Sequence, residues 1–201
     1  DSFHIKTIYN GLEYSYLCYI DTSQLGAISL LNKKPTKASN GTEIIIPVKN
    51  RQDKEKFQEA IFKQLSYFRN IRYIGFHAPD NKILYEDDSC IILKHPPYHG
   101  LHIVLGDVAY EINFATAEIN NWWGEHLENC QVGLKFQIGE LQPTLSREDI
   151  FWDEPTKQKV RNRLEQARRN IRQEIIKELR SERDYAKWYS MVINGKTGKF
   201  P

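Results

Sequence analysis

The spacing of apolar residues changes its period along this chain, and the order of the changes constrains the fold more than any other feature. Apolar and polar residues alternate over residues 2–9 and 12–20, which is the period of a β-strand. Asn10-Gly11 lies between them and tolerates the positive φ angles of a tight hairpin turn. Over residues 53–70 the apolar spacing becomes three and four, as on one face of a helix. Short strand-like segments follow, and the last third is again helical. The order strands, helix, strands, helix predicts an α+β, or mixed α/β, fold in two layers.

Two of the predicted elements bear on function. The β-branched segment 42–48 predicts a buried strand, with Pro47 near its end because proline cannot donate a ladder hydrogen bond. The apolar stripe of the last third predicts one long helix over residues 155–188, begun by Asp153 or Thr156. The remaining predictions are a helix over 53–70 capped by Asp53, a loop at 33–40, strands at 26–32, 72–76, 82–85, 90–93, 101–105, 108–112 and 132–138, and a loop with a short helix at 114–129.

These elements group into two parts with a boundary near Asn70. Residues 1–70 form the first predicted domain, residues 71–192 the second, and the polar, glycine-rich residues 193–201 a linker or tail. The chain opens on Asp1 rather than Met and runs directly into strand-like sequence. We therefore expect an internal fragment of a longer protein.

Composition excludes several classes of protein. With 201 residues, 40% of them hydrophobic and 27% charged, the chain has a globular rather than a disordered composition. Its apolar runs are only a few residues long, whereas a membrane-spanning helix needs about 20, so we expect no membrane span. The net charge of +2 does not by itself indicate nucleic-acid binding. The three cysteines, Cys18, Cys90 and Cys130, contain no C-x-x-C pair, and their odd number predicts a reducing, cytoplasmic location.

Two short motifs are candidates for binding a ligand. Gly41-Thr42 precedes a strand, where glycine lets the backbone approach a ligand and the threonine hydroxyl can hydrogen-bond it, although a plain turn is the simpler interpretation. In the second motif we expect Ser146 to cap a helical turn that begins at Arg147. A cation is unfavourable at the positive end of a helix. Arg147 there indicates either a guanidinium that reaches a phosphate or an arginine paired on the surface.

Three further features have simpler structural interpretations. Cys90 with His95, His99 and His102 loosely resembles a zinc site, but the spacing fits no standard ligand pattern and favours ordinary loop histidines. The tryptophan pair at residues 122–123 is typical of core or interface anchors. The last helix carries many cations that could contact nucleic acid or an anionic membrane, but acids interleave with them as on a solvated face. These cations are Arg161, Arg163, Arg168, Arg169, Arg172, Lys177, Arg180 and Arg183.

The residues alone predict neither a catalytic nor a metal site. No Ser/His/Asp or Cys/His arrangement can be argued, and neither a P-loop nor a G-x-G-x-x-G motif occurs in the sequence.

Three segments, in this order, resemble the second half of a GHKL ATPase, the superfamily of DNA gyrase B, MutL, the large heat-shock chaperones and histidine kinases. Residues 1–11 resemble the strands that follow the ATP lid of that family. Residues 41–48 (GTEIIIPV) resemble the Gly-Thr box that opens the final strand of its nucleotide site. Residues 139–148 (GELQPTLSRE) resemble the L-x-x-S-R-E element of its transducer domain. Within the superfamily the likeness is greatest to phage rIIA (rapid-lysis) proteins.

The resemblance implies a fold and three site residues. Residues 1 to about 70 would be the C-terminal part of a Bergerat-type ATP-binding sandwich. Residues 71 to about 190 would be a ribosomal-S5-like transducer with a long helix. By the same resemblance Gly41 and Thr42 would lie in the nucleotide pocket, and Arg147 would reach the γ-phosphate.

The resemblance also implies what this chain lacks. The family binds Mg-ATP through an asparagine and a glutamate on an early helix, an aspartate-glycine box and a glycine-rich lid, which would all precede Asp1. ATP and Mg²⁺ are therefore expected as cofactors of the full-length protein only. We expect no catalytic residue in this fragment and no ATP hydrolysis by it alone. The implied function is coupling of ATP binding and hydrolysis to domain movement in a phage-encoded cytoplasmic protein. Its partners would be the missing N-terminal ATPase half and a second protomer.

Two other interpretations stay open. In one, the chain is a non-catalytic interaction module that binds a protein, a nucleic acid or a membrane surface through its basic helix. In the other, it is the transducer of a type II topoisomerase subunit. The second ranks lower because no typical switch-lysine loop can be placed.

Overall fold

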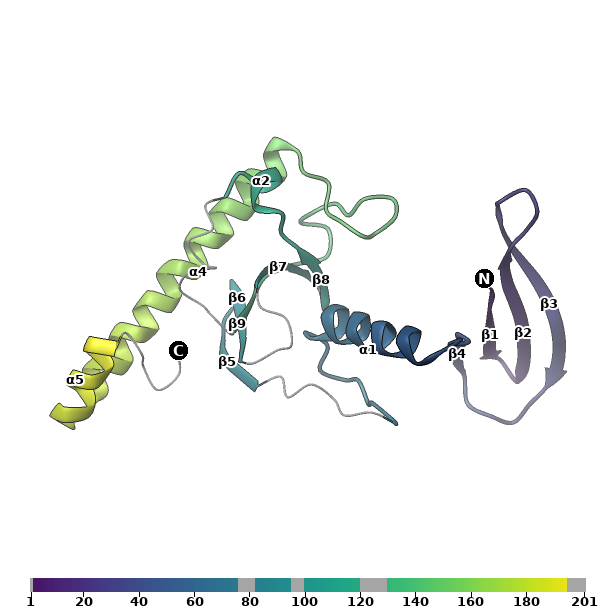
Figure 1. The fold of residues 1–201 in the computed structure, drawn as a ribbon, viewed down its shortest axis with the longest axis horizontal. Coiled ribbons are helices and arrows are strands. Elements are labelled where there is room, and N and C mark those ends of the chain that lie inside the picture. Colours follow the sequence, from purple (N-terminus) through teal and green to yellow (C-terminus); the bar gives the residue numbers. More distant parts are fainter. Residues whose placement is uncertain (1, 76–81, 95–99, 120–129, 195–201) are drawn as a thin grey trace. The chain divides into compact units, whose positions relative to one another are not determined.

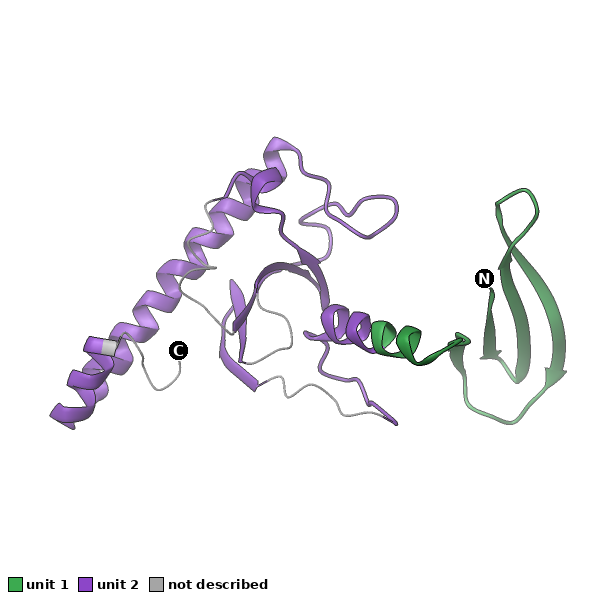
Figure 2. Ribbon diagram, viewed as in Figure 1, with its two compact units in different colours: residues 1–57 green, residues 58–201 purple. Residues whose placement is uncertain are grey.

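The computed structural model of the chain describes residues 2–75, 82–94, 100–119 and 130–194. It contains two β-sheets and several helices, so the predicted α+β class is confirmed. The chain divides into two compact units, residues 1–57 and 58–201 (Figure 2). The border between the units falls within helix α1, Arg51–Leu65, whereas the sequence placed a domain boundary near Asn70.

The first unit is a sheet of four strands, β1 (Ser2–Tyr9), β2 (Leu12–Ile20), β3 (Gly26–Pro35) and β4 (Gly41–Ile45). The strands are antiparallel in the order β3-β2-β1-β4. The predicted hairpin between β1 and β2 is confirmed, with φ angles of 49° at Asn10 and 74° at Gly11. The predicted loop at 33–40 begins too early, because β3 continues to Pro35 by pairing with the first half of β2.

Helix α1 differs from its prediction at both ends. The Asn50 side chain accepts a hydrogen bond from the backbone N–H of Asp53 at 2.9 Å, so Asn50 rather than Asp53 caps the helix. The helix ends at Leu65 rather than at residue 70. The chain turns there because the Tyr67 side chain is buried against the second sheet.

The residues after α1 do not form the strand predicted over 72–76, within the part of that segment that the structure describes. Instead, the Tyr73 ring lies 6.1 Å from the ring of Phe62, centroid to centroid, on the last turns of α1. Tyr73 therefore serves a contact between a helix and a loop, whereas Ile74 is exposed.

The second unit contains a five-stranded mixed sheet (Figure 1). Its strands are β5 (Lys82–Glu86), β6 (Cys90–Lys94), β7 (Gly100–Leu105), β8 (Val108–Glu111) and β9 (Cys130–Phe136), in the order β5-β6-β9-β7-β8. β7 and β9 are parallel, and the other neighbours are antiparallel. The predicted hairpin at Gly106-Asp107 joins β7 to β8, and Gly106 has a φ of 67°.

Helix α4 (Glu154–Ser181) packs on one face of this sheet and forms the main core with it. The Asp153 side chain accepts a hydrogen bond from the backbone N–H of Thr156 at 2.8 Å, so Asp153 is the cap, with Pro155 in the first turn as predicted. The single helix predicted to residue 188 is wrong. Glu182 is extended, and the Asp184 side chain accepts from the N–H groups of Ala186 and Lys187 to begin α5, Tyr185–Asn194. A short helix, α2 (Phe114–Ala117), is capped by the side chain of Asn113.

A partly buried polar cluster fixes α4 to the β5–β6 turn. The Asp87 carboxylate accepts hydrogen bonds from Asn170 Nδ2 on α4 at 2.7 Å, from Ser89 Oγ at 2.6 Å and from Tyr85 Oη at 2.8 Å. Partial burial disfavours its charge, but these donors outweigh that effect and lower the pKa of Asp87 to about 2. Arg163 of α4 also donates to the backbone oxygen of Lys135. Residues far apart in the sequence thus hold the helix in register with the sheet.

Among the described residues, no helix is both long enough and apolar enough to cross a membrane.

Candidate functional site

The register of the first sheet places most of its apolar side chains on one face. Successive side chains of a strand point to opposite faces, and paired residues share a face. Ile5 pairs with Tyr16 of β2 and with Ile44 of β4, and these pairs define what we call the apolar face. Its apolar members are Phe3, Ile5, Tyr9, Leu12, Tyr14, Tyr16, Cys18, Ile20, Ile28, Leu30 and Ile44.

Much of the apolar face is open to solvent. The exposed fraction of the side chain is 69% for Ile28 and 59% for Ile44. The prediction that 42–48 is a buried strand is therefore wrong: the strand covers Gly41–Ile45 and is exposed, because no second layer covers the sheet among the described residues of the first unit. Contiguous exposed apolar surface is typical of sites that bind another protein segment, a ligand or a membrane.

One polar row crosses the apolar face and contains a predicted site residue. Thr7 pairs with Thr42 on one side and with Tyr14 on the other, and Tyr14 pairs with Lys33. The hydroxyl oxygens of Thr7 and Thr42 are 2.9 Å apart, and Thr7 Oγ1 also donates to the backbone oxygen of Gly41 at 3.3 Å. The Lys33 ammonium lies 5.2 Å from the centre of the Tyr14 ring, within cation–π range. The row offers hydroxyl and ammonium groups to whatever covers this face.

The two outer edges of the sheet are unlike. The β3 edge carries Lys33, Lys34 and Pro35, and the register between β2 and β3 shifts between Ser15 and Tyr16. Lysine, proline and bulges are the usual devices that stop an edge from pairing further. β4, with the sequence GTEII, has none of these devices along its length, and its outer edge is unpaired among the described residues. The β4 edge is therefore suited to pair with a further strand.

The Arg147 motif forms a tight loop rather than the predicted helical turn. Thr144 closes the loop: its N–H donates to the backbone oxygen of Asp149 at 2.8 Å, and its hydroxyl donates to the same oxygen at 3.2 Å. Ser146 does not cap a helix, since its hydroxyl lies 3.1 Å from that of Thr144. Arg147 has a φ of 58°, a left-handed conformation that non-glycine residues adopt at a cost of about 1 kcal/mol or more.

The tip of this loop is exposed. Leu145 is fully exposed, and Arg147 forms no ion pair with any of the residues that the structure describes. A solvent-exposed leucine beside an unpaired arginine, both held on a closed loop, is suited to insert into a partner surface. Gly41 and Thr42 belong to the first unit, whereas Arg147 belongs to the second.

An acidic hollow adjoins the Arg147 loop. A cavity of about 580 Å³ is lined by Glu111, Glu148 and Asp149 together with residues 112–115. Lys63 hydrogen-bonds Glu111 at 2.5 Å and lowers the pKa of that carboxyl. The remaining carboxylates oppose an anion at this position, so binding of a phosphate by Arg147 would need further cations from elsewhere.

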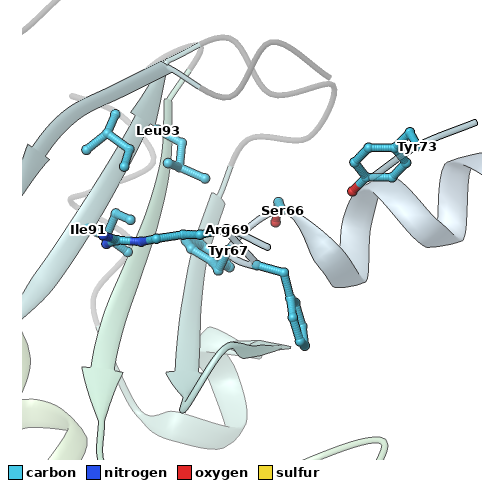
Figure 3. Close-up of a pocket in the computed structure, with 8 residues that line it drawn as sticks. Ser66, Tyr67, Arg69, Tyr73, Ile91 and Leu93 are labelled. Carbon is cyan, nitrogen blue, oxygen red and sulfur yellow. The ribbon is translucent and has the colours of Figure 1, made fainter. Parts of the chain in front are cut away.

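A second cavity, which the sequence did not predict, lies on the opposite face of the second sheet from α4. It has a volume of about 300 Å³ (Figure 3). Figure 3 shows the Arg69 side chain extending across it toward Ile91, beside Tyr67. Arg69 forms an ion pair with Glu86 on β5. The residues that line the cavity are Ser66, Tyr67, Phe68, Arg69, Tyr73, Ile83, Ile91 and Leu93. The sequence pattern missed this cavity because it assigned Tyr67 and Phe68 to a continuing helix.

Buried polar groups lie next to this cavity. The Tyr67 ring stands edge-on to the His102 ring, with centroids 6.1 Å apart, and the Tyr67 hydroxyl has no hydrogen-bond partner among the described residues. The Gln131 amide nitrogen lies 3.4 Å from His102 Nδ1. Burial lowers the pKa of His102 to about 4, so this imidazole is neutral at pH 7.

The zinc interpretation gains no support. His95 and His99 lie outside the described residues. Cys90 and His102 are buried on strands, and nowhere in the described ranges do three His, Cys, Asp or Glu side chains gather as metal ligands would. The tryptophan pair at 122–123 and the linker from residue 195 also lie outside the described residues.

Neither a protein-family model nor a curated protein matches the chain. Its relation to the GHKL ATPases therefore stays a prediction.

Proposed function

We propose that the chain is an internal part of a GHKL ATPase of the phage rIIA type. The first unit would complete an ATP-binding domain, and the second would act as the transducer. The observation that carries this proposal is the open apolar face of the first sheet with the Thr7–Thr42 hydroxyl pair on it. A nucleotide site of this family lies between such a sheet and the helices that cover it.

The unlike edges of the first sheet also support the proposal. The β3 edge is protected from further pairing, as expected at the end of a sheet. The β4 edge has no such protection, so a further strand can pair with it. If strands from the missing N-terminal half pair with β4, that strand becomes central. Gly41 and Thr42 would then lie in the middle of the enlarged sheet, where the hydroxyl of Thr42 can hydrogen-bond a nucleotide.

The Arg147 loop would supply the second contact. An arginine held on a closed, exposed loop can be brought to a terminal phosphate as one rigid piece. The acidic hollow beside it disfavours a free phosphate. Binding would therefore depend on cations in the ATP-binding half. Because Arg147 would need those cations to bind phosphate, it would act only when the nucleotide domain closes.

The residues of this chain fit part of a nucleotide site and not all of it. Thr42 and Arg147 offer a hydroxyl and a guanidinium. ATP with Mg²⁺, when bound to the full-length protein, would supply the phosphate chemistry. The described residues contain no cluster of carboxylates arranged to hold a metal. By the resemblance, the motifs that bind Mg-ATP would precede Asp1, so we predict that this fragment alone is inactive. Helix α4, which Asp87 and Arg163 anchor to the sheet, would pass the movement of the second unit to the parts that follow it.

The test uses the full-length parent protein and the variant Arg147→Ala. We expect ATPase activity to fall by about a hundredfold or more, because an arginine that meets the terminal phosphate typically contributes at least that much. The melting temperature should change by less than about 2 °C, because the side chain is exposed. Thr42→Val should raise the Kd for ATP, and Thr42→Ser should restore it.

A matched control is Arg72→Ala, which removes another exposed arginine outside the proposed site. Equal losses of activity in Arg147→Ala and Arg72→Ala would refute the assignment of Arg147. A parent protein that binds no ATP would refute the whole proposal.

A further inference from the structure

Helix α4 continues well past the core that it helps to form. Its buried residues end at Ile171, and no residue of α4 is buried from there to Ser181. Figure 1 shows this C-terminal stretch extending beyond the strands of the second sheet toward α5. Packing on the sheet therefore explains the sequence of the first part of α4 but not that of the second.

The structure separates the eight cations named from the sequence into two groups. Four of them are paired with acids: Arg161 with Glu118, Arg163 with Glu140, Arg168 with Glu165, and Lys177 with Glu174. The other four are exposed and form no ion pair within the ranges that the structure describes. They are Arg169, Arg172, Arg180 and Arg183, and we call them the arginine stripe.

Three members of the arginine stripe lie on one side of α4, and Arg183 lies just beyond the end of the helix. At 3.6 residues per turn, Arg169, Arg172 and Arg180 fall within an arc of about 80°, along about 16 Å of helix. Glu174 and Glu178 fall on nearly the opposite side, where both are partly buried. Between Arg169 and Arg180 the outward side thus carries only positive charge, unlike the mixed face that the sequence suggested. Glu165 lies one turn earlier on the same side, where it is paired with Arg168.

An exposed aromatic cluster adjoins the stripe. Arg183 is followed by α5, where the ring centre of Tyr185 lies 6.1 Å from that of Trp188 and 6.3 Å from that of Tyr189, in stacked arrangements. Tyr185 is 76% exposed and Tyr189 is 52% exposed. Aromatic rings this exposed provide flat surfaces on which a further ring can stack.

We propose that the arginine stripe and the aromatic cluster of α5 together bind single-stranded nucleic acid. Guanidinium groups match phosphate geometry, and sites for single strands combine such cations with aromatic rings on which bases stack. A membrane surface is less well matched. Helices that lie on membranes carry a continuous apolar side, whereas Ile176 is the only apolar residue within the stripe on α4, and the exposed Val192 and Ile193 lie beyond the stripe, on α5. This site is separate from Thr42 and Arg147 and does not depend on the proposed ATPase function.

The test is fluorescence anisotropy of a labelled single-stranded 20-mer of mixed sequence, titrated with the full chain at several salt concentrations. Four phosphate contacts predict a slope of log K against log salt of about −3. The double variant Arg172→Gln/Arg180→Gln should weaken binding about tenfold and bring the slope to about −1.5. Tyr185→Ala should weaken binding about fivefold or more while leaving the slope unchanged.

The matched control is Arg168→Gln/Lys177→Gln, which removes the same charge from the same helix at paired positions. We expect this control to keep the wild-type slope, and circular dichroism should show that all variants are folded. Equal slopes for the two double variants would overturn the proposal. Absence of binding to the 20-mer would also overturn the proposal. Binding to vesicles of phosphatidylserine and phosphatidylcholine without binding to the 20-mer would overturn it in the same way.

Discussion

Gly133 of β9 lies under the ring of Tyr67, and this close approach leads to a prediction that can be worked out from distances. A Cβ atom built on Gly133 would lie 2.5 Å from Val104 Cγ2 and 2.7 Å from Tyr67 Cε1. Carbon atoms in contact normally lie about 3.5–4.0 Å apart, so each neighbour would have to move by about 1 Å. Val104 is held in the parallel β7–β9 pair, and Tyr67 is buried, so neither side chain can swing into solvent.

The variant Gly133→Ala should therefore destabilise the second unit. Overpacking of a core costs about 1–3 kcal/mol, and two clashes in one place put this site at the upper end. Replacement of glycine by alanine in a strand raises the free energy of unfolding by about 0.5–1 kcal/mol, because alanine loses less conformational entropy on folding. The net expected loss is about 2 kcal/mol in the free energy of unfolding.

The assay is urea unfolding followed by tryptophan fluorescence. All four tryptophans, at positions 122, 123, 152 and 188, lie in the second unit, so this signal reports that unit alone. Gly26→Ala is a useful control, because its Cβ would meet nothing within 4 Å and its φ is not positive. It should leave the tryptophan transition unchanged.

The double variant Gly133→Ala/Val104→Ala tests the cause of the loss. If the clash with Val104 is responsible, the double variant should be more stable than the sum of the single effects by about 1 kcal/mol. A Gly133→Ala protein within about 0.5 kcal/mol of the wild type would refute the reasoning, because it would mean that Tyr67 does not pack on this strand.

Two further predictions concern buried polar groups. The folded pKa of Asp87, about 2, lies below its ordinary value of 3.8, so the stability it contributes is present above about pH 4 and is lost as the pH falls toward 2. The shift corresponds to about 2.4 kcal/mol, which solvent screening of this partly exposed carboxylate reduces to about 1 kcal/mol. Asp87→Asn should thus lower the free energy of unfolding by about 1 kcal/mol at pH 7. In urea unfolding, its free energy of unfolding should also change less than that of the wild type between pH 4 and 2. A change parallel to that of the wild type would contradict this prediction. Tyr67→Phe removes a buried hydroxyl that has no partner within the described residues, so it should raise the free energy of unfolding by about 1 kcal/mol. A decrease of about 1 kcal/mol in the free energy of unfolding would instead show that the hydroxyl forms a hydrogen bond.

The two proposals place different demands on α4. The first part of the helix, up to Ile171, is anchored by core packing and by the Asp87–Asn170 contact, which suits an element that moves with its sheet. The second part carries the arginine stripe outside the core. Under both proposals, α4 would transmit the movement of the second unit to a bound nucleic acid. The two proposals are tested independently of each other.

Local sequence determined the elements whose signals are contained within a few residues. The Asn10-Gly11 turn follows from backbone angles that these two residues tolerate. The Asp153 cap follows from a side-chain oxygen placed before Pro155. The alternation of β1 and β2 and the apolar stripe of α4 required no knowledge of the partners, and together they were enough for the α+β class.

Tertiary structure decided everything that depends on contacts between distant residues. Periodicity marked 42–48 as apolar, but only the arrangement of the sheet showed that Ile44 is exposed. Ser146 and Arg147 have the composition of a helix start, yet the hydrogen bonds of Thr144 close a loop and put Arg147 in a left-handed conformation. Likewise, the sequence could not separate paired from unpaired arginines on α4. Their partners are chosen by distance in space, which a one-dimensional pattern does not contain.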